Sequence, residues 1–366
     1  MKNMGKKLAA AVCGAAFLAV NMMPVMAANQ EGEKTMATVG NTYLTLKDHF
    51  AQKENGKITS TIVDLLAQSN VIIEDAIVRE CNEGSTHKTT VRNGLPEVEF
   101  RKFYQGVNCS KGEYTQITDT TGMLETYSQV DKSLADLEGD TAQFRLNEAT
   151  AFIESMNNTV QKNIFYGSKA TNPAGFDGLS VRYDTISTKP GTVGYQVLDA
   201  GGTGDSNTSI WFITWGDLHT HLLYPKGSQM GLVHEDKGAQ TATDSNGNMY
   251  EVYRDHFKWD IGMSVRDFRS SARIANIDVE ELDGANAADL IKLMIQAYHR
   301  IKRYSKTGKT VIYCNETIET YLHFQAIEKS NVNLTMEEFA GRPIVSFMGI
   351  PVKCADQIVN DEAAVA

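Results

Sequence analysis

Cysteine is scarce in this sequence, with five residues in a chain of 366. Cys13, Cys81, Cys109, Cys314 and Cys354 are widely spaced, and no two of them form a CxxC pair. Zinc knuckles need such pairs, and disulfide-stabilised secreted domains carry an even and denser set of cysteines. The pattern excludes both classes, and it favours packing roles for the last four thiols.

Positive charge is also in deficit. Lysine and arginine number 35 against 45 aspartate and glutamate residues, which gives a formal net charge of −10. A protein whose main task is to neutralise the phosphates of DNA or RNA needs the opposite balance. With 42% hydrophobic and 22% charged residues, the composition is that of a soluble globular protein and excludes a disordered, collagen-like or coiled-coil chain.

Long apolar runs are absent after the first 28 residues, and a membrane-spanning helix would need about 20 apolar residues. The N-terminus is the exception, because lysines precede the apolar run 8–20 and small residues end near Ala27 or Ala28. This is the pattern of a bacterial secretory signal peptide, which would direct the chain to the periplasm. The alternative is that Met36 is the functional start and that residues 1–35 are an extraneous extension.

Motifs of catalysis and cofactor binding are missing as well. Residues 305–310 resemble the end of a phosphate-binding loop, but Arg303 stands where its first glycine is required, and a strand is expected to follow. Residues 202–204 lack the third glycine of a dinucleotide fingerprint, and no GxSxG nucleophile elbow occurs. The sequence therefore predicts no catalytic residue and no cofactor.

Three histidines form a candidate set for a metal site. His219 and His221 flank a single residue, so a strand would place them on the same face, and His234 follows a little later. We favour solvated or hydrogen-bonded imidazoles here, because the surrounding sequence is polar. The alternative function that these histidines leave open is an exported hydrolase or metal-dependent enzyme.

Apolar periodicity predicts an α+β fold without internal repeats. Helices are predicted at residues 41–55, 58–70, 140–166, 287–303 and 316–329. Strands are predicted at residues 209–215, 250–257, 261–276, 310–314, 343–347 and 351–355. The helix at 140–166 is the clearest element, because Asp140 or Thr141 can cap its start, Gly167 can end it, and apolar residues recur at three- and four-residue steps between them.

Residues 84–125 differ from the rest of the chain in having few apolar side chains. Residues 88–92 and 97–101 alternate with period two, and residues 93–96 between them have turn chemistry. The segment therefore predicts a long two-stranded excursion, which is not stable in isolation and must lie on something else. Its own domain and a neighbouring copy of the chain are both open as that support.

Several stretches together resemble the major capsid proteins of tailed bacteriophages with the Hong Kong 97-like fold, in the branch of short-tailed phages that infect Bordetella and related bacteria. The resemblance covers essentially all of residues 36–366. It rests on Thr86–Pro96, Gly122–Glu125, Val130–Lys132, Phe165–Gly167, Gly178–Tyr183, Ser209–Trp211, Tyr224–Gly227, Val265–Arg269, Arg273–Asp278 and Phe347–Val352.

The resemblance implies a division of the chain into the parts of that fold. After residues 1–35, the expected parts are an N-terminal arm at 36–83, an extended β-hairpin loop at 84–125, a peripheral domain at 126–197 with its spine helix at 140–166, a mainly axial domain at 198–350, and a C-terminal strand of the peripheral domain at 351–366. Within the axial range, residues 260–283 are a candidate for a return to the peripheral domain.

The resemblance also implies a function without catalysis: self-assembly into an icosahedral shell that encloses double-stranded DNA. The implied partners are copies of the same chain in hexamers and pentamers, a portal, and scaffold or decoration proteins, with DNA in weak non-specific contact and no membrane contact of the mature body. Capsids assemble in the host cytoplasm, so the resemblance favours Met36 as the functional start over export.

Overall fold

The computed structural model describes residues 53–54, 57–58, 70–137, 139–282, 289–327, 334–339 and 342–366. The predicted signal segment lies outside these residues. So do residues 41–52 of the helix expected at 41–55, and nearly all of the helix expected at 58–70. Where the first of these helices is described, the prediction is wrong: β1 (Lys53–Glu54) pairs antiparallel with β2 (Lys57–Ile58). The sequence between them is Asn55-Gly56, which favours a tight hairpin turn over a helix.

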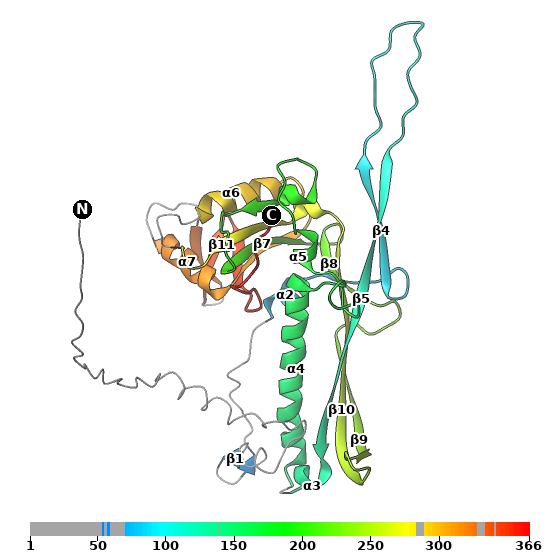
Figure 1. Ribbon diagram of the computed structural model, residues 1–366, viewed down its shortest axis with the longest axis vertical. Helices are drawn as coiled ribbons and strands as arrows, with labels where there is room; N and C mark the ends of the chain where they lie inside the picture. Colours follow the sequence, from blue (N-terminus) through cyan, green and yellow to red (C-terminus); the bar gives the residue numbers. More distant parts are fainter. Residues whose placement is uncertain are drawn as a thin grey trace, which may run out of the picture. The chain divides into compact units, whose positions relative to one another are not determined.

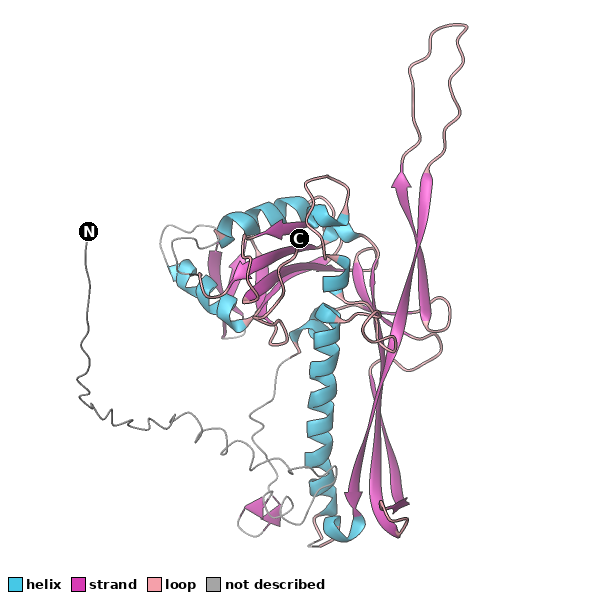
Figure 2. Ribbon diagram, viewed as in Figure 1, coloured by secondary structure: helices cyan, strands magenta, loops and turns pink. Residues whose placement is uncertain are grey.

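Both helices and strands contribute to the fold, as the α+β prediction requires (Figures 1 and 2). The helical elements are α2 (Val71–Asp75), α3 (Lys132–Ala135), α4 (Thr141–Tyr166), α5 (Leu179–Arg182), η3 (Val193–Gln196), η4 (Phe268–Ser270), α6 (Leu290–Ile301) and α7 (Glu316–Ile327). The remaining strands are β3 (Val78–Glu80), β4 (Thr86–Gly94), β5 (Glu113–Asp131), β6 (Val197–Asp199), β7 (Asn207–Trp215), β8 (Thr220–Tyr224), β9 (Leu232–Thr243), β10 (Met249–Val265), β11 (Ala272–Asp278), β12 (Lys309–Cys314), β13 (Leu334–Phe339), β14 (Arg342–Phe347) and β15 (Ile350–Cys354).

Strands β3 to β15 form one connected, mostly antiparallel sheet. Its main path runs β13-β14-β15-β12-β7-β8-β10-β5-β4, while β11 joins β6 to β7, β9 lies beside β10 and β3 lies beside β8. The parallel pairs are β6 with β11, β12 with β15, β3 with β8, and a single pairing between β7 and β8. Among the described residues, no helix is both long and apolar enough to span a membrane.

Strand β7 separates two hydrophobic cores, because all nine of its residues are buried. Trp211, Ile213 and Trp215 point into a core shared with α4 and α5, whereas Ile210 and Phe212 point into a core shared with α6 and α7. Successive side chains of a strand point to opposite faces, so a strand covered on both faces reads as a continuous apolar run. This accounts for the strand predicted at 209–215.

The long helix α4 confirms the prediction for residues 140–166. Val160, Ile164 and Phe165 pack into the first core, and Gly167 ends the helix. A β-carbon at Gly167 would lie 2.5 Å from the carbonyl oxygen of Asn163, so no other residue fits there without displacing backbone.

Two predicted strand boundaries are wrong. The predicted gap between residues 257 and 261 does not exist, because β10 is continuous and pairs with β5 from Val252 to Gly262. The strand predicted at 261–276 is instead interrupted after Val265 by η4, whose start Asp267 caps by accepting a hydrogen bond from the amide of Arg269. Pairing with a long neighbouring strand thus overrode the local pattern.

Candidate functional site: a hairpin with an exposed tip

The long excursion is a hairpin of β4 and the first half of β5, so the two-stranded prediction is confirmed (Figure 1). Thr86 pairs with Thr120 at its base, and Gly94 pairs with Glu113 at its far end. The predicted second strand at 97–101 is wrong, since these residues lie in the connecting loop. Strand β5 continues into its pairing with β10, so its first half is already positioned as the partner of β4.

The loop that joins the two strands, residues 95–112, is hereafter the hairpin loop. Every residue from Leu95 to Lys111 is exposed, including large apolar side chains such as Val98, at 93%, and Phe103, at 90%. Cys109 is exposed as well, so the packing role predicted for this thiol is wrong. Burying one such side chain is worth about 1.5–3 kcal/mol, and clustered exposed apolar side chains mark interaction surfaces. The hairpin loop is therefore the described segment best suited to contact another protein surface.

The base of the hairpin contains a buried polar cluster. Asp119 of β5 accepts a hydrogen bond at 2.7 Å from Nη2 of Arg182, the last residue of α5. Beside them, the rings of His87 on β4 and His221 on β8 meet edge to face, with centroids 5.7 Å apart. This cluster joins the hairpin to β8 and α5 of the same chain.

The pKa of His221 is lowered to about 4, chiefly by burial and secondly by the neighbouring His87. Burial also lowers the pKa of His87, against the attraction of Asp119. The Nδ1 atoms of both rings are buried without a hydrogen-bond partner among the described residues. Both imidazoles are therefore neutral near pH 7. The negative charge of Asp119 is balanced by its ion pair with Arg182.

The three histidines considered as metal ligands do not converge. His219 is buried and its Nε2 lies 2.9 Å from Oγ1 of Thr307, whereas His221 belongs to the base cluster. His234 is hydrogen-bonded to Asp255 at 3.0 Å and stacks on the ring of Phe257. Within the described part of the chain, no group of three or more histidine, cysteine, aspartate or glutamate residues is placed to hold a metal ion.

The side chains that attach the long elements to one another carry no local sequence signal. Arg145 of α4 donates to Asp236 of β9 at 2.7 Å and to Asp255 of β10 at 2.9 Å. Although burial lowers it, the pKa of Arg145 is raised overall by these two carboxylates. Nothing in the sequence marks the three residues as partners, because they are as many as 110 positions apart.

A second attachment holds α2 against β12 and β15. Asp75 is buried and accepts hydrogen bonds from Lys309 at 2.5 Å, from Lys353 at 2.9 Å and from Tyr313 at 2.9 Å. Burial raises the pKa of Asp75, but the two lysines and the phenol outweigh this and leave it lowered. The carboxylate thus stays charged in a buried position.

Comparison with known proteins places this geometry in context. The family model of the major capsid protein GP7 matches residues 53–366. A chain in a structure of bacteriophage Epsilon15, derived from cryo-electron microscopy and modelling, is 40% identical, with a TM-score of 0.72 over 90% of this chain and 99% of that chain. The capsid of bacteriophage JBD30 is 10% identical, with a TM-score of 0.44 over 81% of this chain and 93% of that chain. No curated protein matches.

Proposed function

The chain belongs to the GP7 family of major capsid proteins and has the Hong Kong 97-like α+β fold, and on that premise we propose that it self-assembles into the icosahedral shell of a tailed bacteriophage or prophage. The observation that carries the proposal is the match of the major capsid protein GP7 family model to residues 53–366, supported by 40% identity to a chain of the bacteriophage Epsilon15 structure over 90% of this chain. The shell encloses packaged double-stranded DNA. Membership of the branch of short-tailed phages that infect Bordetella stays a prediction.

The partners in this proposal are first of all other copies of the chain, arranged in hexamers and pentamers. The exposed apolar side chains of the hairpin loop support self-association, because no described residue of their own chain buries them. Many repeated contacts of modest strength then stabilise a closed surface together. A portal and scaffold or decoration proteins complete the set of proposed partners.

The proposed roles of the chain segments follow the fold family. We assign residues 36–83 to the N-terminal arm, 84–125 to the extended loop, 126–197 to the peripheral domain, 198–350 mainly to the axial domain with 260–283 returning to the peripheral domain, and 351–366 to the last peripheral strand. Supporting this, β7 separates one core around α4 from a second core around α6 and α7.

We also propose that the shell assembles in the host cytoplasm and that DNA touches its wall weakly and without sequence preference. The excess of acidic over basic residues supports weak contact with phosphates. Mass spectrometry of the N-terminus in particles from induced cells tests the compartment. A start at Met36 or Ala37 is expected, whereas a start near Asn29 would indicate export.

The role is that of a structural protein, as the family indicates, and the competing hydrolase or metal enzyme has no support from the separated histidines His219, His221 and His234. Electron microscopy of the purified full chain tests the proposal. Capsid subunits are expected to form rings or closed shells. Small uniform particles that bind stoichiometric metal or turn over a substrate would contradict it.

A further inference from the structure

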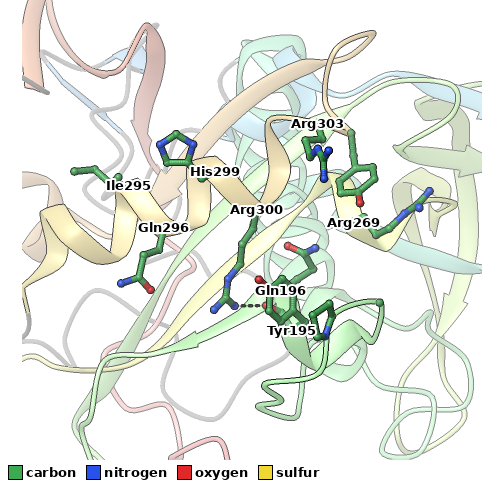
Figure 3. A pocket seen from close by; sticks show the side chains of 11 residues that line it. Tyr195, Gln196, Arg269, Ile295, Gln296, His299, Arg300 and Arg303 are labelled. Carbon is green, nitrogen blue, oxygen red and sulfur yellow. Dashed lines mark hydrogen bonds between the residues drawn. The ribbon is translucent and has the colours of Figure 1, made fainter.

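A pocket of about 560 Å³ lies between α6 and the short helical turns η3 and η4. Four basic side chains line it: Arg269 from η4, His299 and Arg300 from α6, and Arg303 just after α6. Figure 3 shows Arg300 reaching from the helix toward Tyr195, while Arg303 and Arg269 lie together near the end of the helix. Among the residues that the structure describes, no aspartate or glutamate lines the pocket.

The positive charge of this pocket is only partly compensated within the chain. Arg269 is paired with Asp267 through two hydrogen bonds of 2.8 and 3.0 Å. Arg300 stacks on the ring of Tyr195 at 4.3 Å and donates to backbone carbonyl oxygens, not to a carboxylate. Arg303 is exposed and makes no hydrogen bond or ion pair with any described residue.

A buried amide adds an unpaired polar group to the same wall. Gln196 lines the pocket and is only 3% exposed, yet its Oε1 has no hydrogen-bond partner among the described residues. Leaving a buried polar atom unpaired is energetically unfavourable, so such an atom indicates a missing partner. Arg300 and Arg303, together with this amide, therefore form a built polar site that suits an anionic group accompanied by hydrogen-bond donors, as a peptide segment provides.

We propose that the pocket binds a carboxylate from a second copy of the chain, supplied by Glu97 or Glu99 of that copy's hairpin loop. The inference rests on the proposed function, because it requires copies to lie side by side. Both glutamates are exposed and form no ion pair within the described residues. Arginine guanidinium groups bind carboxylates through paired hydrogen bonds, which accounts for two arginines without carboxylate partners.

The apolar part of the pocket favours a peptide over a phosphate backbone. In an extended segment, Glu97 and Glu99 lie on one side while Val98 and Phe100 lie on the other. Both apolar side chains are almost fully exposed in the isolated chain. The pocket provides Ile295, Tyr195 and Tyr304 as apolar surface beside its arginines. One peptide segment can therefore place its carboxylates against the arginines and its apolar side chains against this surface.

Charge reversal tests the contact in the full-length chain. Arg303→Glu and the double variant Glu97→Lys/Glu99→Lys are each expected to lose shells, measured by sedimentation and electron microscopy, because like charges then face each other. Combining the three substitutions is expected to restore shells. Lys306→Glu changes the same charge outside the pocket lining and is expected to assemble normally, and thermal unfolding of each monomer reports whether the variants fold.

Disulfide trapping gives an independent readout. In a Cys109→Ser background, Glu99→Cys with Arg303→Cys is expected to form cross-links between subunits in oxidised shells, whereas Glu99→Cys with Lys306→Cys is not. Normal assembly of Arg303→Glu, or the absence of both charge rescue and cross-links, overturns the proposal. Shells of Arg303→Glu that form but package less DNA also overturn it, since the anion is then a phosphate. If the unmodified chain forms no shells at all, the proposed function fails first and this inference fails with it.

Discussion

Arg273 donates a hydrogen bond from Nη2 to Oε2 of Glu362 at 2.8 Å, with both side chains at least 95% buried. The pair links β11 to the C-terminal segment. Tyr166, the last residue of α4, donates a hydrogen bond to the other carboxylate oxygen at 2.5 Å. The pKa of its phenol is raised, first by burial and second by this carboxylate. The end of the long helix, a core strand and the chain terminus therefore meet at one buried carboxylate.

Removing one partner of this pair is expected to destabilise the monomer strongly. Arg273→Ala leaves the Glu362 carboxylate buried without its cation, which costs about 3–5 kcal/mol in comparable buried pairs. Chemical denaturation of the monomer measures the change in the free energy of unfolding. Arg79→Ala, which removes a half-exposed ion pair with Asp217, is the matched control and is expected to cost no more than about 1 kcal/mol. Equal costs for the two variants would show that the buried pair has no special role.

Acidification is expected to weaken the base of the hairpin through His221. Its pKa is about 4 in the folded chain and 6.5 unperturbed, so the unfolded chain binds more protons between these values. Stability is therefore full above about pH 6.5 and falls as the pH drops toward 4, by on the order of 3 kcal/mol. Around His221 lie His87 on β4, Asp119 on β5 and Arg79 on β3, of which only Asp119 favours the protonated ring.

Unfolding curves of the monomer at several pH values test this expectation. His221→Asn keeps a neutral polar side chain and is expected to flatten the dependence between pH 4 and 6.5. His299→Asn, at an exposed position on α6, is the control and is expected to leave it unchanged. A wild-type stability that does not change over this range would contradict the assignment.

Removal of the hairpin tip is expected to separate folding from assembly. Replacing residues 95–111 by a short glycine-serine linker removes only exposed side chains and spares Thr89 and Asp119, which are buried at the base. The melting temperature of the monomer should change little, while shells disappear from sedimentation profiles. A monomer that unfolds would mean instead that the hairpin loop supports its own domain.

Glycine at position 178 is expected to be irreplaceable for packing reasons. A β-carbon there would lie 2.6 Å from the carbonyl oxygen of Asn163 and 2.8 Å from the amide of Gly167. Gly178→Ala should therefore cost about 1–3 kcal/mol by forcing two backbone segments apart. Gly106→Ala in the hairpin loop meets no atom within 4 Å and should stay within about 0.5 kcal/mol of wild type, measured by thermal unfolding. Similar values for both would disprove the close approach.

Local patterns predicted the elements whose burial is set by their own residues. Helix α4 appeared at residues 140–166 because its apolar positions repeat with the helical period, and β7 appeared at 209–215 because both of its faces are covered. The predicted strand at 97–101 failed because alternation alone does not create a strand without a partner, and the partner of β4 is β5.

The sequence likewise predicted some features of the candidate site and missed others. The low apolar content of residues 84–125 marked the excursion, but not its pairing or the buried base around Asp119 and His221. The pocket around Arg300 and Arg303 gave no sequence signal, since its walls come from segments about 100 residues apart. Such clusters form through long-range packing that no local window contains.

By itself, the sequence determined that the chain is an α+β protein with a long helix, a thinly apolar excursion and no recognisable catalytic motif, because periodicity and composition are local properties. Only the tertiary structure decided which strand supports the excursion, which charges are buried together, and which cations remain without carboxylates. Those outcomes depend on hydrogen-bond ladders and desolvated contacts between distant segments, whose energies exist only once the whole sheet has formed.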